Sequence, residues 1–325
     1  MSDPSASADA PRYSFVIPVY NEREVLPQLF PRLDALLERL DGPAEVLLVD
    51  DGSRDGSVDV VRVKCDADRR YRLIRLSRNF GHQIAITAGI DQAVGSAVIV
   101  MDADLQDPPE VALELIDKWR EGYEVVSAKR AVRDGESRFK LWTAHLFYRV
   151  LDRLTPVRIE KDVGDFRLMD RKFVAAFSQM RERDRFVRGM VSWVGFRQTT
   201  VTFHREKRVA GKTKYPLSKM LRLAADGIIG FSDIPLRIAL WFGTLVSVLA
   251  MAFGIYVFAG WLFNAALVPG WASTVIILTF LGGVNLMMIG IAGLYVGRIY
   301  EQVKNRPLYI IDPDDEPDTS PVRTR

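Results

Sequence analysis

The first half of the chain alternates short apolar runs with segments whose apolar positions recur every three or four residues. The short runs, rich in β-branched and aromatic residues, predict strands at Tyr13–Tyr20, Glu45–Val49, Tyr71–Leu76 and Ala97–Met101. The intervening segments predict helices, among them one opened by Asn21 and continuing through Leu37, and another over Ile84–Val94. Strands that alternate with helices in this way predict an α/β domain with a mostly parallel sheet.

The last third of the chain has a different pattern. Ile238–Phe263 and Trp271–Gly297 contain no charged residue, and the connector between them ends in Pro-Gly, a turn signal. At about 1.5 Å per residue the first stretch makes a helix roughly 39 Å long, which exceeds the ~30 Å hydrocarbon core of a bilayer. We therefore expect a transmembrane hairpin over residues 234–298, rather than two buried helices of a soluble core.

Basic residues flank both ends of this hairpin, whereas the connector Asn264–Gly270 carries no charge. By the positive-inside rule, both termini and the α/β domain are predicted to lie on the cytoplasmic side of a cell membrane that the chain crosses twice. Residues 1–11 lack the basic start and apolar run of a signal peptide. Residues 312–325 are rich in proline and acids, and we expect both ends to be disordered.

The segment that precedes the hairpin has an amphipathic pattern. Its apolar residues recur at three- and four-residue spacing, at Leu217, Met220, Leu221, Ala224, Ile228 and Phe231. This pattern predicts an interfacial helix over 217–233, with a helix packed on the α/β domain as the alternative. The expected order is thus a disordered 1–11, an α/β domain over 12–216, the interfacial helix, the hairpin with spans 238–263 and 271–297, and a cytoplasmic tail over 299–325.

The amino-acid composition limits the partners and the metal sites that the chain can have. The net charge is only +3, so bulk charge does not indicate a nucleic-acid partner. One cysteine, Cys65, excludes an internal disulfide and a Cys-rich zinc site, and three scattered histidines disfavour a histidine metal cluster. Any metal chemistry would therefore depend on carboxylates.

Acidic residues follow two predicted strands directly. Asp50 and Asp51 end one strand, and Asp102 and Asp104 end another. Ligands of parallel sheets bind at the carboxyl ends of strands, where carboxylates can bond a base or ribose or hold Mg²⁺ or Mn²⁺ with substrate phosphates. Solvated strand ends are the alternative, but two acidic ends after buried strands favour a nucleotide-diphosphate and metal site. Asp107, followed by two prolines, is expected to cap the next helix.

These motifs, taken in order, resemble the family 2 glycosyltransferases with a GT-A fold. The resemblance begins at Val16–Glu22, Val49–Ser53 and Asp102–Gln106. Arg78–Gln83, Gly164–Leu168 and Gly211–Tyr215, with the hairpin, are similar to the polyprenyl-phosphate branch, which includes dolichyl-phosphate mannose synthase and bacterial undecaprenyl-phosphate glucosyltransferases. The resemblance extends over roughly Arg12 to Pro307.

The resemblance implies roles for individual residues. Those expected to bind the nucleotide are Pro18, Tyr20, Glu22, Asp50, Asp51 and Asp102. Those expected at a Mg²⁺ or Mn²⁺ ion are Asp102, Asp104 and Gln106. Asp51 contacts the ribose or braces its loop, and both roles stay open. Asp104 and Arg130 are expected to help stabilise the leaving diphosphate.

The acceptor side is implied in the same way. Asp165 is expected beside the acceptor. It acts either as a base or, because a phosphate monoester is already largely ionised at neutral pH, as a group that orients the acceptor or holds a bridging cation. The basic residues expected to hold the acceptor phosphate are Arg167, Arg205, Lys207, Arg208 and Lys214. For the basic residues just before the interfacial helix, Arg205 to Lys214, simple attraction to anionic lipid is the alternative.

The activity implied is inverting transfer of a hexose, glucose from UDP-glucose, to undecaprenyl phosphate at the cytoplasmic membrane face. The partners implied are a nucleotide sugar, a polyprenyl phosphate and the bilayer. GDP-mannose or a modified aminosugar is the rival donor. A processive polysaccharide synthase would carry Gln-x-x-Arg-Trp where this chain has Asp184–Met190, and a non-enzymatic membrane scaffold would not need the ordered acids. Gly293 and Gly297 form a GxxxG spacing, compatible with association between helices or with a homo-oligomer.

Overall fold

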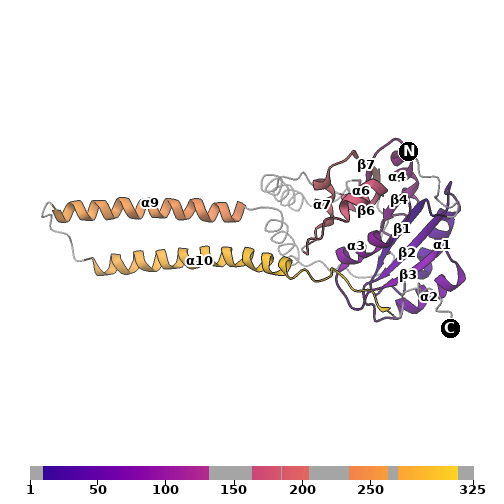
Figure 1. Ribbon diagram of the computed structural model, residues 1–325, viewed down its shortest axis with the longest axis horizontal. Helices are drawn as coiled ribbons and strands as arrows, with labels where there is room; N and C mark the ends of the chain where they lie inside the picture. The colour runs from indigo at the N-terminus through magenta and orange to yellow at the C-terminus, as the bar shows by residue number, and fades with distance from the viewer. Residues whose placement is uncertain (1–9, 132–162, 184, 205–233, 263–269, 314–325) are drawn as a thin grey trace, which may run out of the picture. The chain divides into compact units, whose positions relative to one another are not determined.

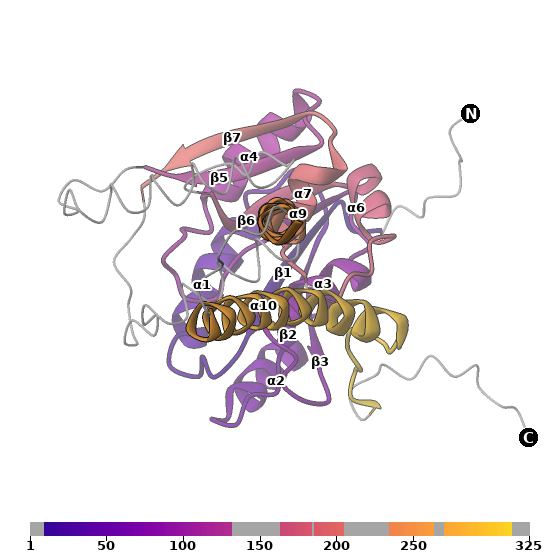
Figure 2. The same cartoon turned by 90° about the vertical axis from the view of Figure 1, so that its left-hand side faces the viewer.

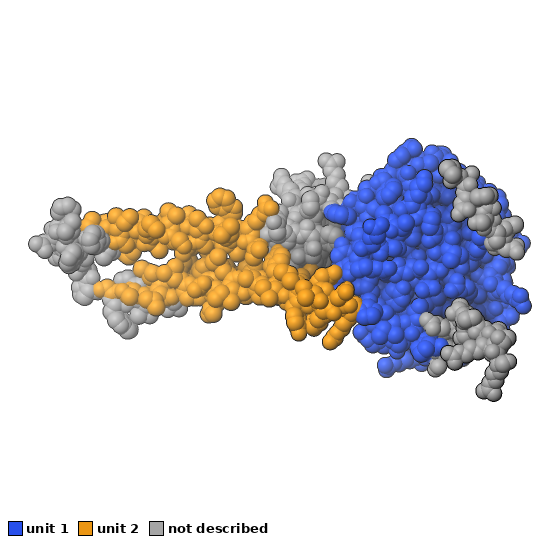
Figure 3. Space-filling view, viewed as in Figure 1, with its two compact units in different colours: residues 1–152, 157–216, 307–325 blue, residues 153–156, 217–306 orange. Residues whose placement is uncertain are grey.

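The computed structural model describes residues 10–131, 163–183, 185–204, 234–262 and 270–313. The chain divides into two compact units, one of residues 1–152, 157–216 and 307–325 and one of residues 153–156 and 217–306 (Figure 3). The expected interfacial helix over 217–233 and nearly all of the connector lie outside the described residues.

The first unit contains a mixed sheet with strand order β3-β2-β1-β4-β6-β5-β7. Figure 2 shows the strands fanned from β7 at the top to β3 at the bottom. The strands are β1 Tyr13–Val19, β2 Ala44–Asp50, β3 Tyr71–Arg75, β4 Ala97–Val100, β5 Val125–Arg130, β6 Val163–Asp170 and β7 Gln198–Phe203. β1 to β4 are mutually parallel where they pair, whereas β6 runs antiparallel to both β4 and β5.

Helices cover both faces of this sheet (Figure 1). One face packs against α1 Leu26–Leu37, α2 Ser57–Ala67 and α4 Val111–Arg120. The other packs against α3 His82–Gln92, α6 Arg171–Phe177 and α7 Val187–Val194. Alternate residues of β1 serve the two faces, since Phe15 belongs to the α1 and α4 core and Val16 lies under Gly89 of α3. The expectation of a mostly parallel α/β sheet is confirmed.

One helix boundary differs from the sequence prediction. Asn21 and Glu22 were expected to open a helix, but α1 begins at Leu26. Asn21 has a φ of 55°, and its N–H donates to Ser53 Oγ, while that of Glu22 donates to Ser57 Oγ. These bonds tie the end of β1 to the loop after β2, so the chain enters the helix later than its polar pattern suggested.

The second unit contains α9 Ile234–Leu262 and α10 Trp271–Val303. Within these helices, Leu236–Tyr256 and Phe280–Val303 are long and apolar enough to cross a membrane, with mean hydropathies of 2.1 and 1.7. The second helix continues six residues past the expected end at Gly297. The two helices touch where Gly243 lies against Met288, whereas a Cβ added at Gly293 or Gly297 would meet no described atom within 4 Å.

The segment after α10 returns to the first unit. Ser77 donates its N–H to the Ile310 carbonyl and Asp312 donates to the Arg75 carbonyl, at 2.9 and 2.8 Å, so Ile311 forms an antiparallel bridge with Leu76 beside β3. Tyr309 donates its hydroxyl to Asp91 of α3 at 3.0 Å. Asp312, expected to begin a disordered tail, is therefore held at the sheet edge.

Candidate active site

The candidate residues meet at one edge of the sheet. The parallel strands β1, β2 and β4 end at this edge. β5 is antiparallel to β6 and ends at the same edge, with Arg130. β6 runs the opposite way, so its first residues, including Asp165, reach the same edge. One reversed strand thus brings Asp165 to the strand end that carries Asp102.

Two aspartates at the end of β2 accept backbone hydrogen bonds that fix the loops around it. Asp50, 1% exposed, accepts the backbone N–H groups of Gly52 and Ser53. Asp51 accepts the N–H groups of Phe80 and Gly81 at 2.7 and 2.9 Å, one with each carboxylate oxygen. Burial raises the pKa of both carboxyls although these bonds oppose it. Asp51 therefore occupies the loop-bracing position, and its role at a ribose stays a prediction.

The remaining residues predicted to bind the nucleotide line the adjoining β1 end. Pro18 is buried in β1 and pairs in register with Val49. Tyr20 is 48% exposed just beyond the strand, and Glu22 is half-buried. An exposed aromatic ring beside a polar loop is a surface on which a base can stack.

The loop after β4 carries the predicted metal residues. Asp102 and Asp104 are half-buried, the Gln106 side chain is buried, and Leu105 between them has a φ of 57°. Such a conformation is uncommon for a residue with a branched side chain and is typical of functional loops. Asp104 accepts the Gln106 N–H at 3.1 Å.

Asp102 has a buried oxygen suited to a cation. Its Oδ1 accepts no hydrogen bond from the described residues, although His82 Nε2 lies 3.4 Å away. Burial raises the pKa of Asp102 to about 6, with the neighbouring acids adding to the effect. Among the described residues no group of three acids, histidines or cysteines has metal-binding geometry. Two carboxylates still fit Mg²⁺ or Mn²⁺, which commonly take one or two carboxylates and complete their shell with substrate phosphates.

Arg130 and Asp107 form an ion pair beside this loop. Arg130 Nη2 lies 3.2 Å from Asp107 Oδ2, and Asp107 is 1% exposed. The expectation that Asp107 caps a helix is wrong, because α4 begins at Val111 and its capping position is Glu110. Asp107 instead holds Arg130 at the end of β5.

Asp165 stands at the centre of a polar cluster. It is 5% exposed and accepts hydrogen bonds from Gln83 Nε2 and Arg188 Nε, both at 3.1 Å. His82 Nε2 lies 3.4 Å from Asp165 and 3.4 Å from Asp102, so the histidine bridges the two carboxylates. Burial alone would raise the pKa of Asp165, but the bond from His82 and the charges of Arg188 and Arg167 hold it far below its usual range.

Three residues of this cluster received no role from the sequence: His82, Gln83 and Arg188. His82 and Gln83 are the first two residues of α3. The side-chain oxygen of Gln83 accepts a hydrogen bond from the Val187 N–H, and this bond connects α3 to α7. Arg188 lies in the stretch that was compared with the polysaccharide synthase motif. His82 and Gln83 lie in Arg78–Gln83, one of the motifs that carry the family resemblance, and this motif is the sequence feature that could have pointed to them.

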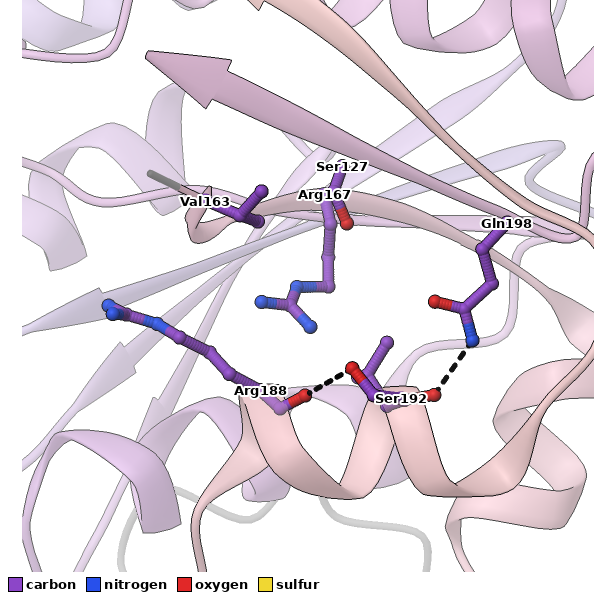
Figure 4. A pocket seen from close by; sticks show the side chains of 7 residues that line it. Ser127, Val163, Arg167, Arg188, Ser192 and Gln198 are labelled. Carbon is purple, nitrogen blue, oxygen red and sulfur yellow. Dashed lines mark hydrogen bonds between the residues drawn. The ribbon is translucent and has the colours of Figure 1, made fainter. Parts of the chain in front are cut away.

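Arg167, predicted to hold the acceptor phosphate, is 2% exposed and lies in a pocket under α7 (Figure 4). The other residues predicted for that phosphate, Arg205, Lys207, Arg208 and Lys214, lie outside the described residues.

A mostly parallel α/β sheet with acidic residues at the carboxyl ends of its strands is typical of ligand-binding enzymes, and residues 14–177 match glycosyl transferase family 2. The chain belongs to that family. It is 49% identical over 300 residues to an uncharacterized glycosyltransferase of Bacillus subtilis, covering 92% of this chain and 93% of the relative. It is 39% identical over 300 residues to a prophage-derived bactoprenol glucosyl transferase of Shigella flexneri, covering 92% of this chain and 97% of the relative.

Among solved structures, the glucosyl-3-phosphoglycerate synthase of Mycobacterium tuberculosis in complex with Mn²⁺, UDP-glucose and phosphoglyceric acid aligns with a TM-score of 0.46. The alignment has 18% sequence identity and covers 69% of this chain and 79% of that one.

Proposed function

We propose that the protein transfers glucose from UDP-glucose to a polyprenyl phosphate, giving a polyprenyl monophosphate sugar. The observation that carries the proposal is the meeting of Asp102 and Asp165 across β4 and β6, bridged by His82. A donor-side carboxylate and an acceptor-side carboxylate at one sheet edge suit a direct transfer between two bound substrates. The sugar and lipid classes come from relatives of nearly full length that are named bactoprenol glucosyl transferase.

The donor would lie over the ends of β1, β2 and β4. In this position Tyr20 offers a stacking surface, and Asp50 with Asp51 keeps the loop after β2 in shape. Asp102 and Asp104 would hold a divalent cation, which when bound neutralises charge on the leaving diphosphate. Arg130, fixed by Asp107, adds a second positive charge close to the loop.

The reaction is a single displacement. An oxygen of the lipid phosphate forms the new bond to the anomeric carbon as the bond to the diphosphate breaks, and UDP leaves with the electron pair. The acceptor oxygen is already ionised, so no enzyme group has to remove a proton. Asp165 orients the acceptor side through Arg188 and His82, and the configuration at the anomeric carbon inverts.

Membrane attachment fits a lipid acceptor. We infer that α9 and α10 cross the bilayer and that the catalytic unit faces the cytoplasm, because basic residues flank the hairpin and the connector carries none.

The test is a donor screen with the full-length protein in detergent, undecaprenyl phosphate and Mg²⁺ or Mn²⁺. Labelled UDP-glucose should label the lipid phase, GDP-mannose and UDP-N-acetylglucosamine should not, and Asp102→Asn should lose transfer while still folding. Label from GDP-mannose alone would replace the donor, and a growing polymer would support the synthase. Absence of donor binding would overturn the proposal.

A further inference from the structure

Gly164 is the second residue of β6 and stands directly before Asp165. Its backbone does not require glycine, because Gly164 is not one of the described residues with a positive φ. Glycine inside a strand is unfavourable, and it often marks a place where another group approaches the backbone closely. A group that needs the space of a side chain should therefore lie against Gly164.

The group that occupies this space is the guanidinium of Arg130, at the end of β5. A Cβ added at Gly164 would lie 2.9 Å from Arg130 Nη2, 3.4 Å from Cζ and 3.8 Å from Nε. Its nearest neighbours would thus all belong to this one planar group. The guanidinium lies against the glycine backbone, and a side chain at this position would displace it.

A carboxylate fixes the same guanidinium. Arg130 Nη2 lies 3.2 Å from Asp107 Oδ2, and the Asp107 side chain is 1% exposed. Asp107 follows Asp102 and Asp104 in the loop after β4. The glycine backbone and the carboxylate together define where the positive charge lies, which is beside the loop predicted to hold the metal and the diphosphate.

Gly164 and Asp165 serve opposite faces of the sheet. Ala128 of β5 belongs to the core on the α4 face, and Arg130, the next residue but one, lies on the same face. Asp165 lies on the other face, where Arg188 of α7 donates to it. A single peptide bond at the start of β6 therefore joins the residue that borders the donor-side arginine to the acceptor-side carboxylate.

The pairing of β5 with β6 is irregular at this point. Ser127 pairs with Arg167, but Lys129 pairs with Val163, so residues 164–166 of β6 lie opposite residue 128 alone. Bulges of this kind are frequent beside active sites, where they change the direction of side chains. Gly164 and Asp165 thus lie in the stretch of β6 that departs from regular pairing.

We propose that Gly164 is a positioning residue, which keeps open the place from which the Arg130 guanidinium reaches the leaving diphosphate. The inference rests on the proposed function and deepens it, because it concerns the diphosphate that the transfer releases. UDP carries more negative charge on its terminal phosphate than the intact sugar nucleotide does, because the bond to the sugar is gone. An arginine placed for that charge stabilises the transition state and bound UDP more than the intact donor.

Two substitutions and their combination test this role. Gly164→Ala adds one methyl group to a backbone that tolerates alanine, and the atoms it meets are the end of a flexible side chain. The guanidinium should therefore move aside while the fold remains. Arg130→Lys keeps the positive charge but lacks the planar group that lies against Gly164. In this background the added methyl group should matter little, so the double variant is the matched control.

The experiment uses the four full-length proteins in detergent, compared first by melting temperature. Gly164→Ala should lower kcat for transfer from UDP-glucose about tenfold and leave the KM of the donor unchanged, because the lost interaction belongs to the transition state. The same change in the Arg130→Lys background should alter kcat by less than about twofold. The second readout needs no transfer: Gly164→Ala should raise the Kd of UDP, or of GDP if the wild type binds that instead, about tenfold.

The comparison between backgrounds decides the proposal. An equal fall in kcat with and without Arg130→Lys would mean that Gly164 acts independently of Arg130, and this would overturn the proposal. Unchanged kcat and unchanged UDP affinity in Gly164→Ala would overturn it as well. A general loss of folding would appear in both backgrounds and would count as the independent effect. If the wild type transfers no sugar at all, the transfer proposal fails, but the nucleoside diphosphate affinities still decide the role of Gly164.

Discussion

Asp165 is ionised at every pH at which the protein would be assayed. Its folded pKa is depressed, so the carboxylate form is fully present above the ordinary value and would be lost only far below it. A carboxylate with so low a pKa is a weak proton acceptor. Asp165→Asn should therefore lower kcat/KM by about 10²-fold through loss of Arg188 and His82 positioning.

The shape of the pH dependence tests this interpretation. Above the pH range in which Asp102 and His82 titrate, the ratio of wild-type to Asp165→Asn activity should stay constant, because no titration of Asp165 falls there. At lower pH the ratio also reflects Asp102 and His82, because Asp165 raises the pKa of both groups. A ratio that changed about tenfold per pH unit in the upper range would make Asp165 a base in the literal sense. Both proteins should first be compared by melting temperature, so that unfolding is not mistaken for loss of activity.

Gly52 is the glycine on which the nucleotide loop depends. Its φ is +74°, and an added Cβ would lie 2.7 Å from the Asn79 backbone nitrogen. Gly52→Ala should cost about 1–2 kcal/mol for the left-handed backbone, with a further loss from this contact, and should raise the KM of the donor. Chemical denaturation and donor kinetics would measure the two effects.

Gly122 supplies the control for that substitution. It also has a positive φ, +92°, but an added Cβ would meet only the end of the Arg197 side chain, at 3.4 Å. Gly122→Ala should show the backbone cost alone and leave the KM of the donor unchanged. Equal destabilisation and equal kinetics for the two variants would contradict a special role for the loop.

At the residue scale, the sequence predicted the strand-end acids and missed their partners for a physical reason. Asp50, Asp51, Asp102 and Asp104 follow apolar strands directly, so position along the chain was enough to place them. His82 and Arg188 acquire importance through Asp165, which is 83 and 23 residues away along the chain. Their contacts depend on the direction of β6, which hydrophobic periodicity does not specify.

At the scale of elements, the segment after α10 forms an antiparallel bridge at the β3 edge of the sheet. Its two backbone bonds use the N–H of Ser77 and the N–H of Asp312, and Asp312 also lies 3.3 Å from Arg75. Asp312→Pro would remove the second bond and the ion pair while keeping an extended backbone. Asp312→Ala would keep the backbone bond and remove the ion pair, which at this exposure is worth about 0–1 kcal/mol.

Hydrogen exchange of the β3 edge should distinguish these variants. Asp312→Pro should accelerate exchange at Leu76 and Ser77 about tenfold or more, since about 1.4 kcal/mol of local stability corresponds to that factor, and Asp312→Ala should have a smaller effect. Unchanged exchange in Asp312→Pro would mean that the segment does not protect the edge in solution. The sequence did not predict this pairing, because the short apolar run Leu308–Ile311 does not indicate which sheet edge it joins.

The structure confirms the predicted helices and strands whose hydrophobic pattern is strongly periodic or continuously apolar. The four early strands and the two apolar helices were found near their expected bounds. The start of α1 was shifted because Asn21 and Glu22 use their backbone donors on Ser53 and Ser57. A local hydrophobic pattern cannot predict such contacts, because they join segments more than thirty residues apart in the sequence.

At the scale of the whole molecule, the single cysteine offers a means to test membrane topology. Cys65 is half-buried in α2, and burial raises its pKa to about 11 from an ordinary value of 9.0. Its thiolate fraction at neutral pH is therefore about 10²-fold below that of an exposed thiol, and native protein should label slowly with maleimide. New cysteines can then be detected without removing it.

Two such positions distinguish the sides of the membrane. Ala266 lies in the uncharged connector and Thr319 in the C-terminal segment, beyond the basic residues that follow α10. Because Lys and Arg are retained on the cytoplasmic side, Ala266→Cys should react with a membrane-impermeant maleimide in intact cells, and Thr319→Cys only after permeabilisation. Reaction of Thr319→Cys in intact cells would place the catalytic unit outside, where no nucleotide sugar is supplied, and the transfer mechanism would fail with the topology. Reaction of neither until permeabilisation would mean that the two apolar helices do not cross the bilayer and that the protein meets its lipid acceptor from one face.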